Sequence, residues 1–121
     1  MAKEKHRGPQ EFGPLSPASL HILLVLAGKD LHGYGIMQEI TRQSEGKYKV
    51  GPGTLYDNLK KMMKQGLVEV TDDRSLTSDP RRRYYRLTGL GRGVLTAEVK
   101  WLEGVLREAR MHLRLLNPRG T

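Results

Sequence analysis

The chain has 121 residues, no cysteine and a formal net charge of +8 at pH 7. This length gives room for one domain of ordinary size, with or without an added oligomerisation element. The absence of cysteine excludes a disulfide framework and a thiolate metal site, and the four histidines have no metal-ligand spacing.

The first sixteen residues, MAKEKHRGPQEFGPLS, are charged and rich in proline and glycine. They contain no apolar run that would serve as a signal peptide, and no later segment approaches the length of a membrane span. We therefore expect a cytoplasmic protein without membrane association. Residues 1–16 are expected to form a flexible N-terminal segment.

Two helices are predicted next. Residues 17–27, PASLHILLVLA, are almost continuously apolar, which predicts a core helix buried nearly all round. Ser16 and Pro17 suit the cap and first turn of that helix, and Gly28 is placed to end it. The following segment has Ile36, Met37 and Ile40 at helical spacing and predicts a second helix over about residues 34–44, packed across the first.

A third helix is predicted over residues 52–65. Pro52 is tolerated in a first turn, and Gly66 can adopt the left-handed conformation that ends a helix. One face is apolar and is expected to enter the core: Leu55, Leu59, Met62 and Met63. The opposite face combines cations with short hydrogen-bonding groups, as suits phosphates and base edges: Thr54, Asp57, Asn58, Lys61 and Lys64.

Beyond Gly66 the pattern becomes alternating, which predicts a strand over residues 68–71 with Val68 and Val70 on one side. Residues 72–80 are polar and form a longer connection than the commonest hairpins use. The segment RRRYYRL at 81–87 then predicts a second, paired strand. This hairpin is expected to be the wing of a winged helix-turn-helix.

The positive charge is concentrated in this region. Residues 47–86 contain ten basic and five acidic side chains, whereas residues 17–46 contain two basic and three acidic ones. A basic patch on one structural element is typical of a nucleic-acid-binding protein. The alternative is a merely solvated surface.

The last helix is predicted over residues 89–117, where the glycines of TGLGRG begin it. Its apolar positions alternate spacings of four and three, a repeat typical of a helix that packs along a partner. The expected dimer contacts are Leu95, Val99, Leu102, Leu106, Ala109, Leu113 and Leu116. Trp101, Val105 and Leu115 widen this face, so contact with the first helix is also expected. The alternative is a helix that only folds back on a monomeric core.

Three segments together resemble the PadR family of bacterial transcriptional regulators: LHGYGIMQEI, GPGTLYDNLKKMMKQGLVEV and RRRYYRLTGLGRGVL. The resemblance covers roughly residues 17–100. It implies a winged helix-turn-helix that binds DNA as a dimer. The chain departs from the family at Gly51, where many members have a polar capping residue, and it resembles the shorter members because a single helix follows the wing.

The resemblance implies a phosphate contact for Tyr56 and for Tyr34, although Tyr34 is equally interpreted as a core aromatic. Position in the recognition helix adds Thr54 and Asn58 as groove contacts. Three lysines spread round this helix, so at least one is expected to face backbone phosphates, with generic solvation as the alternative for one of them: Lys60, Lys61 and Lys64.

Three consecutive arginines follow the wing loop and are expected to reach a minor groove or its phosphates, although adjacent residues on a strand face opposite ways: Arg81, Arg82 and Arg83. Three acidic residues in the wing would be repelled by DNA, so either the loop tip points away or non-specific affinity is limited: Asp72, Asp73 and Asp79.

The fold class expected is α+β and mostly helical: residues 17–88 as a winged helix-turn-helix and residues 89–117 as a C-terminal dimerisation helix. The expected function is a homodimeric repressor of an inverted-repeat operator in double-stranded DNA, with no cofactor or metal. Trp101 is the hypothetical site of a small aromatic effector, its alternative being a packing role. The rival function is a protein-interaction adaptor that uses the same basic face. No catalytic constellation is evident, so an enzyme is not expected.

Overall fold

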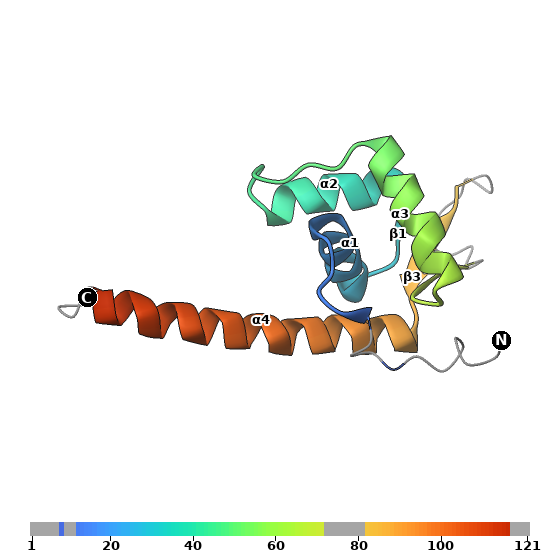
Figure 1. Cartoon of the computed structure of the whole chain (residues 1–121). Helices are drawn as coiled ribbons and strands as arrows, with labels where there is room; N and C mark the ends of the chain where they lie inside the picture. Colours follow the sequence, from blue (N-terminus) through green and yellow to red (C-terminus); the bar gives the residue numbers. More distant parts are fainter. Residues whose placement is uncertain (1–7, 9–11, 72–81, 117–121) are drawn as a thin grey trace.

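The computed structural model describes residues 8, 12–71 and 82–116, except for the side chains of Leu115 and Leu116. The elements in chain order are α1 (Pro17–Gly28), β1 (Leu31–His32), α2 (Gly33–Gln43), α3 (Pro52–Lys64), β2 (Val68–Thr71), β3 (Tyr84–Leu87) and α4 (Gly89–Leu116). The first three helices and the sheet form a head, and α4 runs along α1 and continues far past it (Figure 1). The fold is the expected mostly helical winged helix-turn-helix. In the described ranges no helix is long and apolar enough to cross a membrane.

Helix α1 lies at the centre of the head. The Ser16 hydroxyl accepts a hydrogen bond from the Ser19 N–H (3.2 Å), which satisfies one of the free donors of the first turn. Ile22, Leu23 and Leu26 are fully or almost fully buried, but Leu24 is exposed. The expectation of burial all round is therefore wrong on one side, because neither the head nor α4 of the same chain covers it.

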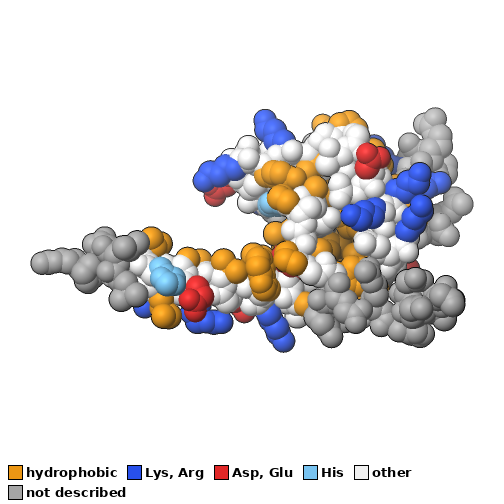
Figure 2. Space-filling view, in the orientation of Figure 1, with side chains coloured by type: hydrophobic (Ala, Val, Ile, Leu, Met, Phe, Trp, Pro, Cys, Tyr) orange, Lys and Arg blue, Asp and Glu red, His pale blue; other side chains and the backbone are white. Residues whose placement is uncertain are grey.

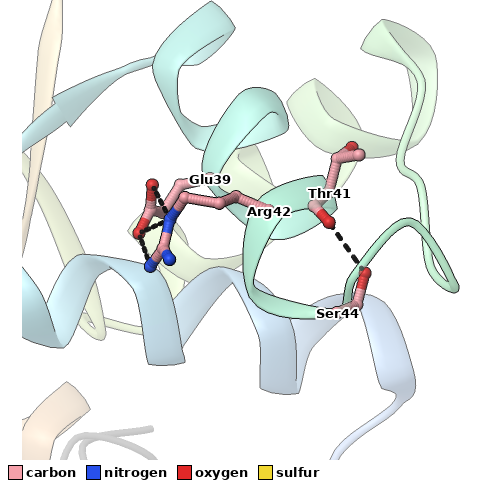
Figure 3. Close-up of polar contacts among 4 residues, drawn as sticks. All are labelled: Glu39, Thr41, Arg42 and Ser44. Atoms are coloured by element: carbon pink, nitrogen blue, oxygen red, sulfur yellow. Dashed lines mark hydrogen bonds and ion pairs between the residues drawn. The ribbon is translucent and has the colours of Figure 1, made fainter.

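Helix α2 ends in a turn closed by Ser44. The Ser44 hydroxyl accepts from the Tyr48 N–H (3.0 Å) and donates to the Thr41 carbonyl (Figure 3). The partly buried Glu39 and the exposed Arg42 form an ion pair one turn apart (Figure 3). Gly46 follows with φ of +80°, a left-handed conformation that glycine adopts without strain. This turn sets the direction in which α3 departs.

Helix α3 ends as expected at Gly66, whose φ is +79°. Its N-terminal residue Gly51 provides no side-chain cap, in agreement with the sequence. The predicted inner face is confirmed: Leu55, Leu59 and Met62 are buried in the core, and Met63 is partly buried against it. This burial fixes which side of α3 remains in solvent.

The sheet has the antiparallel order β1-β3-β2. The pairing of β2 with β3 confirms the hairpin, and it places Val68 opposite Leu87 and Val70 opposite Tyr85. Strand β1 was not predicted; its two residues, Leu31 and His32, pair with Tyr85 and Tyr84 on the other side of β3. Val70 is exposed although Val68 is buried, so the alternation predicted for β2 does not give two equally buried positions.

A tight joint connects the end of α3 to the start of α4. The Thr88 hydroxyl donates to the Gly66 carbonyl (2.6 Å) and accepts from the Gly91 N–H (3.0 Å). Gly91 is buried, and a Cβ on it would overlap the Leu67 carbonyl oxygen. Only glycine allows α4 to approach the backbone just before β2 this closely, and the predicted role of these glycines in starting the last helix is confirmed.

Candidate nucleic-acid interface

The solvent side of α3 carries the predicted contact residues. Thr54, Lys60, Lys61 and Lys64 are all exposed, as is Asp57. Lys and Arg side chains gather over α3 in the space-filling view (Figure 2). With its inner face held by the core, α3 presents a convex and mostly cationic surface of a shape that a DNA major groove admits.

Asn58 lies differently from its neighbours. Its amide donates to the Thr54 carbonyl (2.8 Å), and its Oδ1 accepts from the Ser19 hydroxyl of α1 (3.2 Å). Each end of the amide therefore already has one partner within the chain, so we expect Asn58 to hold α3 against α1 rather than to read a base.

We expect Asn58→Ala to lower the free energy of unfolding by about 1 kcal/mol, because it removes the hydrogen bond between α1 and α3. Affinity for DNA should change less than twofold. Thermal unfolding and DNA titration of the same preparation test this expectation. Thr54→Ala, which changes an exposed residue of the same helix, is the matched variant for both measurements. A large loss of affinity by Asn58→Ala without loss of stability would contradict it.

The start of α2, α3 and the strand β3 enclose an open pocket of about 360 Å³. Among the described residues its lining has no carboxylate and consists of His32, Gly33, Tyr34, Tyr56, Arg82, Arg83 and Tyr85. Tyr34 is 62% exposed, so the interpretation of this residue as a core aromatic is wrong. The pocket thus brings together four of the residues predicted to bind DNA: Tyr34, Tyr56, Arg82 and Arg83.

Gly33 determines where Tyr56 lies. The Tyr56 phenol crosses directly over Gly33, and a Cβ there would overlap its hydroxyl and lie 2.7 Å from its ring carbon Cζ. Gly33 is buried while Tyr56 is 47% exposed. The lack of a side chain on Gly33 therefore lets Tyr56 lie against the start of α2 with its hydroxyl at the pocket.

His32 occupies the junction between this pocket and the wing. Its Nδ1 accepts a hydrogen bond from the Gly35 N–H (3.0 Å) and so caps α2, while its Nε2 lies 3.1 Å from Nη1 of Arg82. The ring packs edge-on against Tyr84. Burial, together with the Arg82 charge, lowers the pKa of His32, so the imidazole is neutral at pH 7.

Tyr85 of β3 and Arg83 just before it complete this wall of the pocket. Burial of the Tyr85 phenol, together with the nearby Tyr56, raises its pKa, while a hydrogen bond from Arg83 acts in the opposite direction. Tyr85 is therefore a neutral hydroxyl at physiological pH. Every ionised group lining the described pocket is a cation, which is the electrostatic character of an oxyanion site.

The predicted dimer residues on α4 divide into two groups. Leu95 is 7% exposed and belongs to the chain's own core, so it has little surface left for a partner. The expected contact between α4 and α1 is present. Further along, Leu102 is partly buried, and the remaining described members of the stripe are exposed: Val99, Leu106, Ala109 and Leu113. Trp101 is 51% exposed and Val105 is also in solvent, so neither is a packing residue of the single chain.

Several sequence predictions lie outside the described residues: Arg81, the loop 72–80 with its three aspartates, the side chains of Leu115 and Leu116, and most of segment 1–16. Conversely, no role was predicted for His32 and Gly33, although both lie in the segment LHGYGIMQEI that carries the resemblance. The available signal was a histidine two residues before the predicted helix start, and the structure begins α2 one residue earlier, at Gly33, so that His32 becomes its cap. Within the described ranges, no group of three or more His, Asp or Glu side chains could hold a metal ion.

Comparison with known proteins gives a consistent result. Residues 22–97 match the model of the transcriptional regulator PadR-like family. The chain is 37% identical over 89 residues to transcriptional regulator Rv3488 of Mycobacterium tuberculosis, covering 74% of this chain and 78% of that protein.

Solved structures share the fold. A PadR family transcription regulator from hypervirulent Clostridium difficile matches with a TM-score of 0.62 and 28% identity, covering 83% of this chain and 99% of that one. Bacillus subtilis PadR, solved in complex with operator DNA, matches with a TM-score of 0.57 and 23% identity, covering 74% and 48%. At that identity the second likeness concerns the fold alone.

Proposed function

Because the chain belongs to the PadR-like family of transcriptional regulators, we propose that it binds an inverted-repeat operator in duplex DNA as a homodimer and represses transcription. The observation that carries this proposal is the exposed cationic side of α3 next to a pocket lined by cations and hydroxyls. The fold relative from Bacillus subtilis was solved with operator DNA, which supports the same assignment.

In this proposal α3 enters the major groove. Thr54 lies in the first turn of α3 and would contact base edges, while the lysines on α3 neutralise backbone phosphates on either side. Tyr34 in the first turn of α2 and Tyr56, which lies against Gly33, would contact the phosphates that flank the groove. Binding of this kind should weaken steeply as salt rises, since each neutralised phosphate releases counterions.

The wing would provide the second contact. Arg82 and Arg83 immediately precede β3 and line the same pocket as Tyr56, so the wing and the recognition helix act on neighbouring phosphates. Arg81 is proposed to share this role. An arginine in this position can also enter an adjacent, narrow minor groove.

The homodimer is proposed from α4. This helix has 28 residues, about 42 Å at 1.5 Å per residue, and its C-terminal part extends beyond the head (Figure 1). The apolar stripe continues along this exposed part, and Figure 2 shows an open notch between the head and α4 with apolar side chains on the side turned toward it. Such a stripe is unfavourable in water and is expected to be covered by the same helix of a second copy.

Release by a small aromatic ligand is the further part of this proposal. Trp101 is half exposed on α4, next to the proposed interface, where it can stack on a flat ring. A ligand there would shift the separation of the two recognition helices. Titration of planar aromatic compounds should quench tryptophan fluorescence and weaken operator binding together; an unchanged signal in both would refute this part.

The deciding experiment is selection of bound sequences from a random duplex pool, followed by titration of the selected duplex at two salt concentrations. We expect an inverted repeat whose half-sites are about one helical turn apart, bound at least ~10³-fold more tightly than random duplex. A protein-interaction adaptor would recover no preferred sequence, and its salt-sensitive binding would be equal for all duplexes.

Lys61→Ala should weaken binding roughly threefold to tenfold for all sequences alike and reduce the salt slope by about 1, because one phosphate contact is lost. The dimer should persist, since Lys61 lies on the exposed side of α3 and does not belong to the apolar stripe of α4. Titration over a salt series, with sedimentation of the same sample, measures both. An unchanged salt slope would show that Lys61 contacts no phosphate.

A further inference from the structure

The two ring nitrogens of His32 have different roles that the backbone fixes. The Gly35 N–H points at Nδ1 at 3.0 Å and cannot rotate, because it belongs to the first turn of α2. In a neutral imidazole one nitrogen accepts and the other carries the proton. Since Nδ1 accepts, Nε2 carries the hydrogen.

This assignment makes the contact with Arg82 a meeting of two donors. Nε2–H of His32 and the guanidinium Nη1 of Arg82 lie 3.1 Å apart, and arginine has no lone pair to offer. Two donors that face each other without an acceptor are unfavourable, and Arg82 is an exposed side chain that is free to turn away. Both donors are satisfied when a single oxygen atom between them accepts one hydrogen bond from each.

The surroundings suit an anionic oxygen. Both groups line the pocket that also holds Tyr34, Tyr56 and Arg83, and none of its described lining residues is acidic. From these contacts we infer that His32 and Arg82 form a two-donor clamp for one phosphate oxygen of the DNA backbone. His32 thus has two tasks, since the bond that caps α2 also directs its other nitrogen toward the ligand. This inference rests on the proposed DNA binding.

Substitution by asparagine separates the two tasks. Asparagine is a good N-cap whose side-chain oxygen accepts from the same backbone N–H, but it has no group at the position of Nε2. His32→Asn should therefore unfold like the wild type and bind the selected duplex about tenfold more weakly, the usual scale for a lost hydrogen bond to a charged group. Because the lost donor is neutral, the salt slope should not change.

Arg82→Gln is the matched variant that removes the cation from the same clamp. It should weaken binding and also reduce the salt slope by about 1. Combined with His32→Asn, it should cost less than the product of the two single effects, since both donors act on one oxygen. His32→Ala, which removes cap and donor together, should in addition lower the unfolding temperature.

Nitrogen-15 NMR of the imidazole ring gives an independent test on the full chain. The ring should show the Nε2–H tautomer in the free protein, and its signals should shift on addition of the selected duplex but not with millimolar inorganic phosphate. An Nδ1–H tautomer, equal binding by His32→Asn and wild type, or an equal shift with inorganic phosphate would overturn the clamp. If the wild type bound no duplex, the proposed function would fail and DNA phosphate would be excluded as the occupant, whereas the tautomer would still be measured.

Discussion

Leu106→Asp should convert the protein to a monomer and weaken operator binding by about 100-fold or more. Leu106 is 49% exposed in the middle of the α4 stripe, so an aspartate there adds no strain within one chain. In the proposed dimer the carboxylate would be buried against apolar side chains at a cost of several kcal/mol. Binding to two half-sites then loses the gain that comes from linking two recognition helices.

Sedimentation at several protein concentrations measures the first effect, and titration of the selected duplex measures the second. Met111→Asp is the matched control, because Met111 is equally exposed and lies five residues further on, about 140° round the helix. It makes the same charge change and should leave the dimer intact. If Leu106→Asp remained dimeric, or if both variants dissociated alike, the stripe would not be the interface.

Gly91→Ala should lower the free energy of unfolding by about 2 kcal/mol or more. The added methyl would overlap the Leu67 carbonyl oxygen and lie 2.9 Å from Cδ1 of Leu87. Neither the Leu67 backbone nor the start of α4 can move without disturbing the hydrogen bonds around Thr88. Overpacking against backbone typically costs 1 to 3 kcal/mol.

Gly104→Ala is the control within the same helix. The nearest atom to its added methyl is the end of the flexible Arg107 side chain at 3.8 Å. Alanine is the better helix former by roughly 0.8 to 1 kcal/mol, so this variant should be as stable as wild type or more stable. Chemical unfolding at one fixed protein concentration compares the two, and equal stability of Gly91→Ala and wild type would contradict the tight joint.

The helices could be predicted because their signals are local. The apolar spacing of Leu55, Leu59 and Met62 defines the inner face of α3, and Gly66 ends that helix in the left-handed conformation that its residue type favours. The same holds for the capping of α1 by Ser16. Such features depend on residues three or four positions apart. The order of the helices and strands along the chain was supported in addition by the resemblance to known regulators.

Features that depend on distant partners could not be predicted in this way. Strand β1 has two residues and no period, and it exists because Tyr84 and Tyr85 pair with it from about fifty positions further on. Asn58 falls on the outer side of α3 in a helical projection, but Ser19 of α1 reaches it. Leu95 fits the apolar repeat of α4, yet it is buried in the core of its own chain and leaves little surface for a partner.

The pocket shows both situations. Tyr34, Tyr56 and two of the wing arginines were identified by residue type and position, and the structure brings them to one place. Gly33 and His32 were not, because their roles arise only where Tyr56 and Arg82 meet the start of α2. A glycine that makes room and a histidine that caps a helix have no periodic pattern to reveal them.

The joint around Thr88 has a mechanical consequence. It holds the end of the recognition helix against the start of a helix about 42 Å long, through three hydrogen bonds of Thr88 and the close contact at Gly91. A tilt of about 5° at that joint displaces the far end of α4 by about 4 Å. Conversely, a displacement of that end by about 4 Å would tilt the recognition helix by about 5°. In a dimer paired through two such helices, a small change in the angle between them would change the distance between the two heads. That distance determines the spacing of the half-sites that the heads can contact on one duplex.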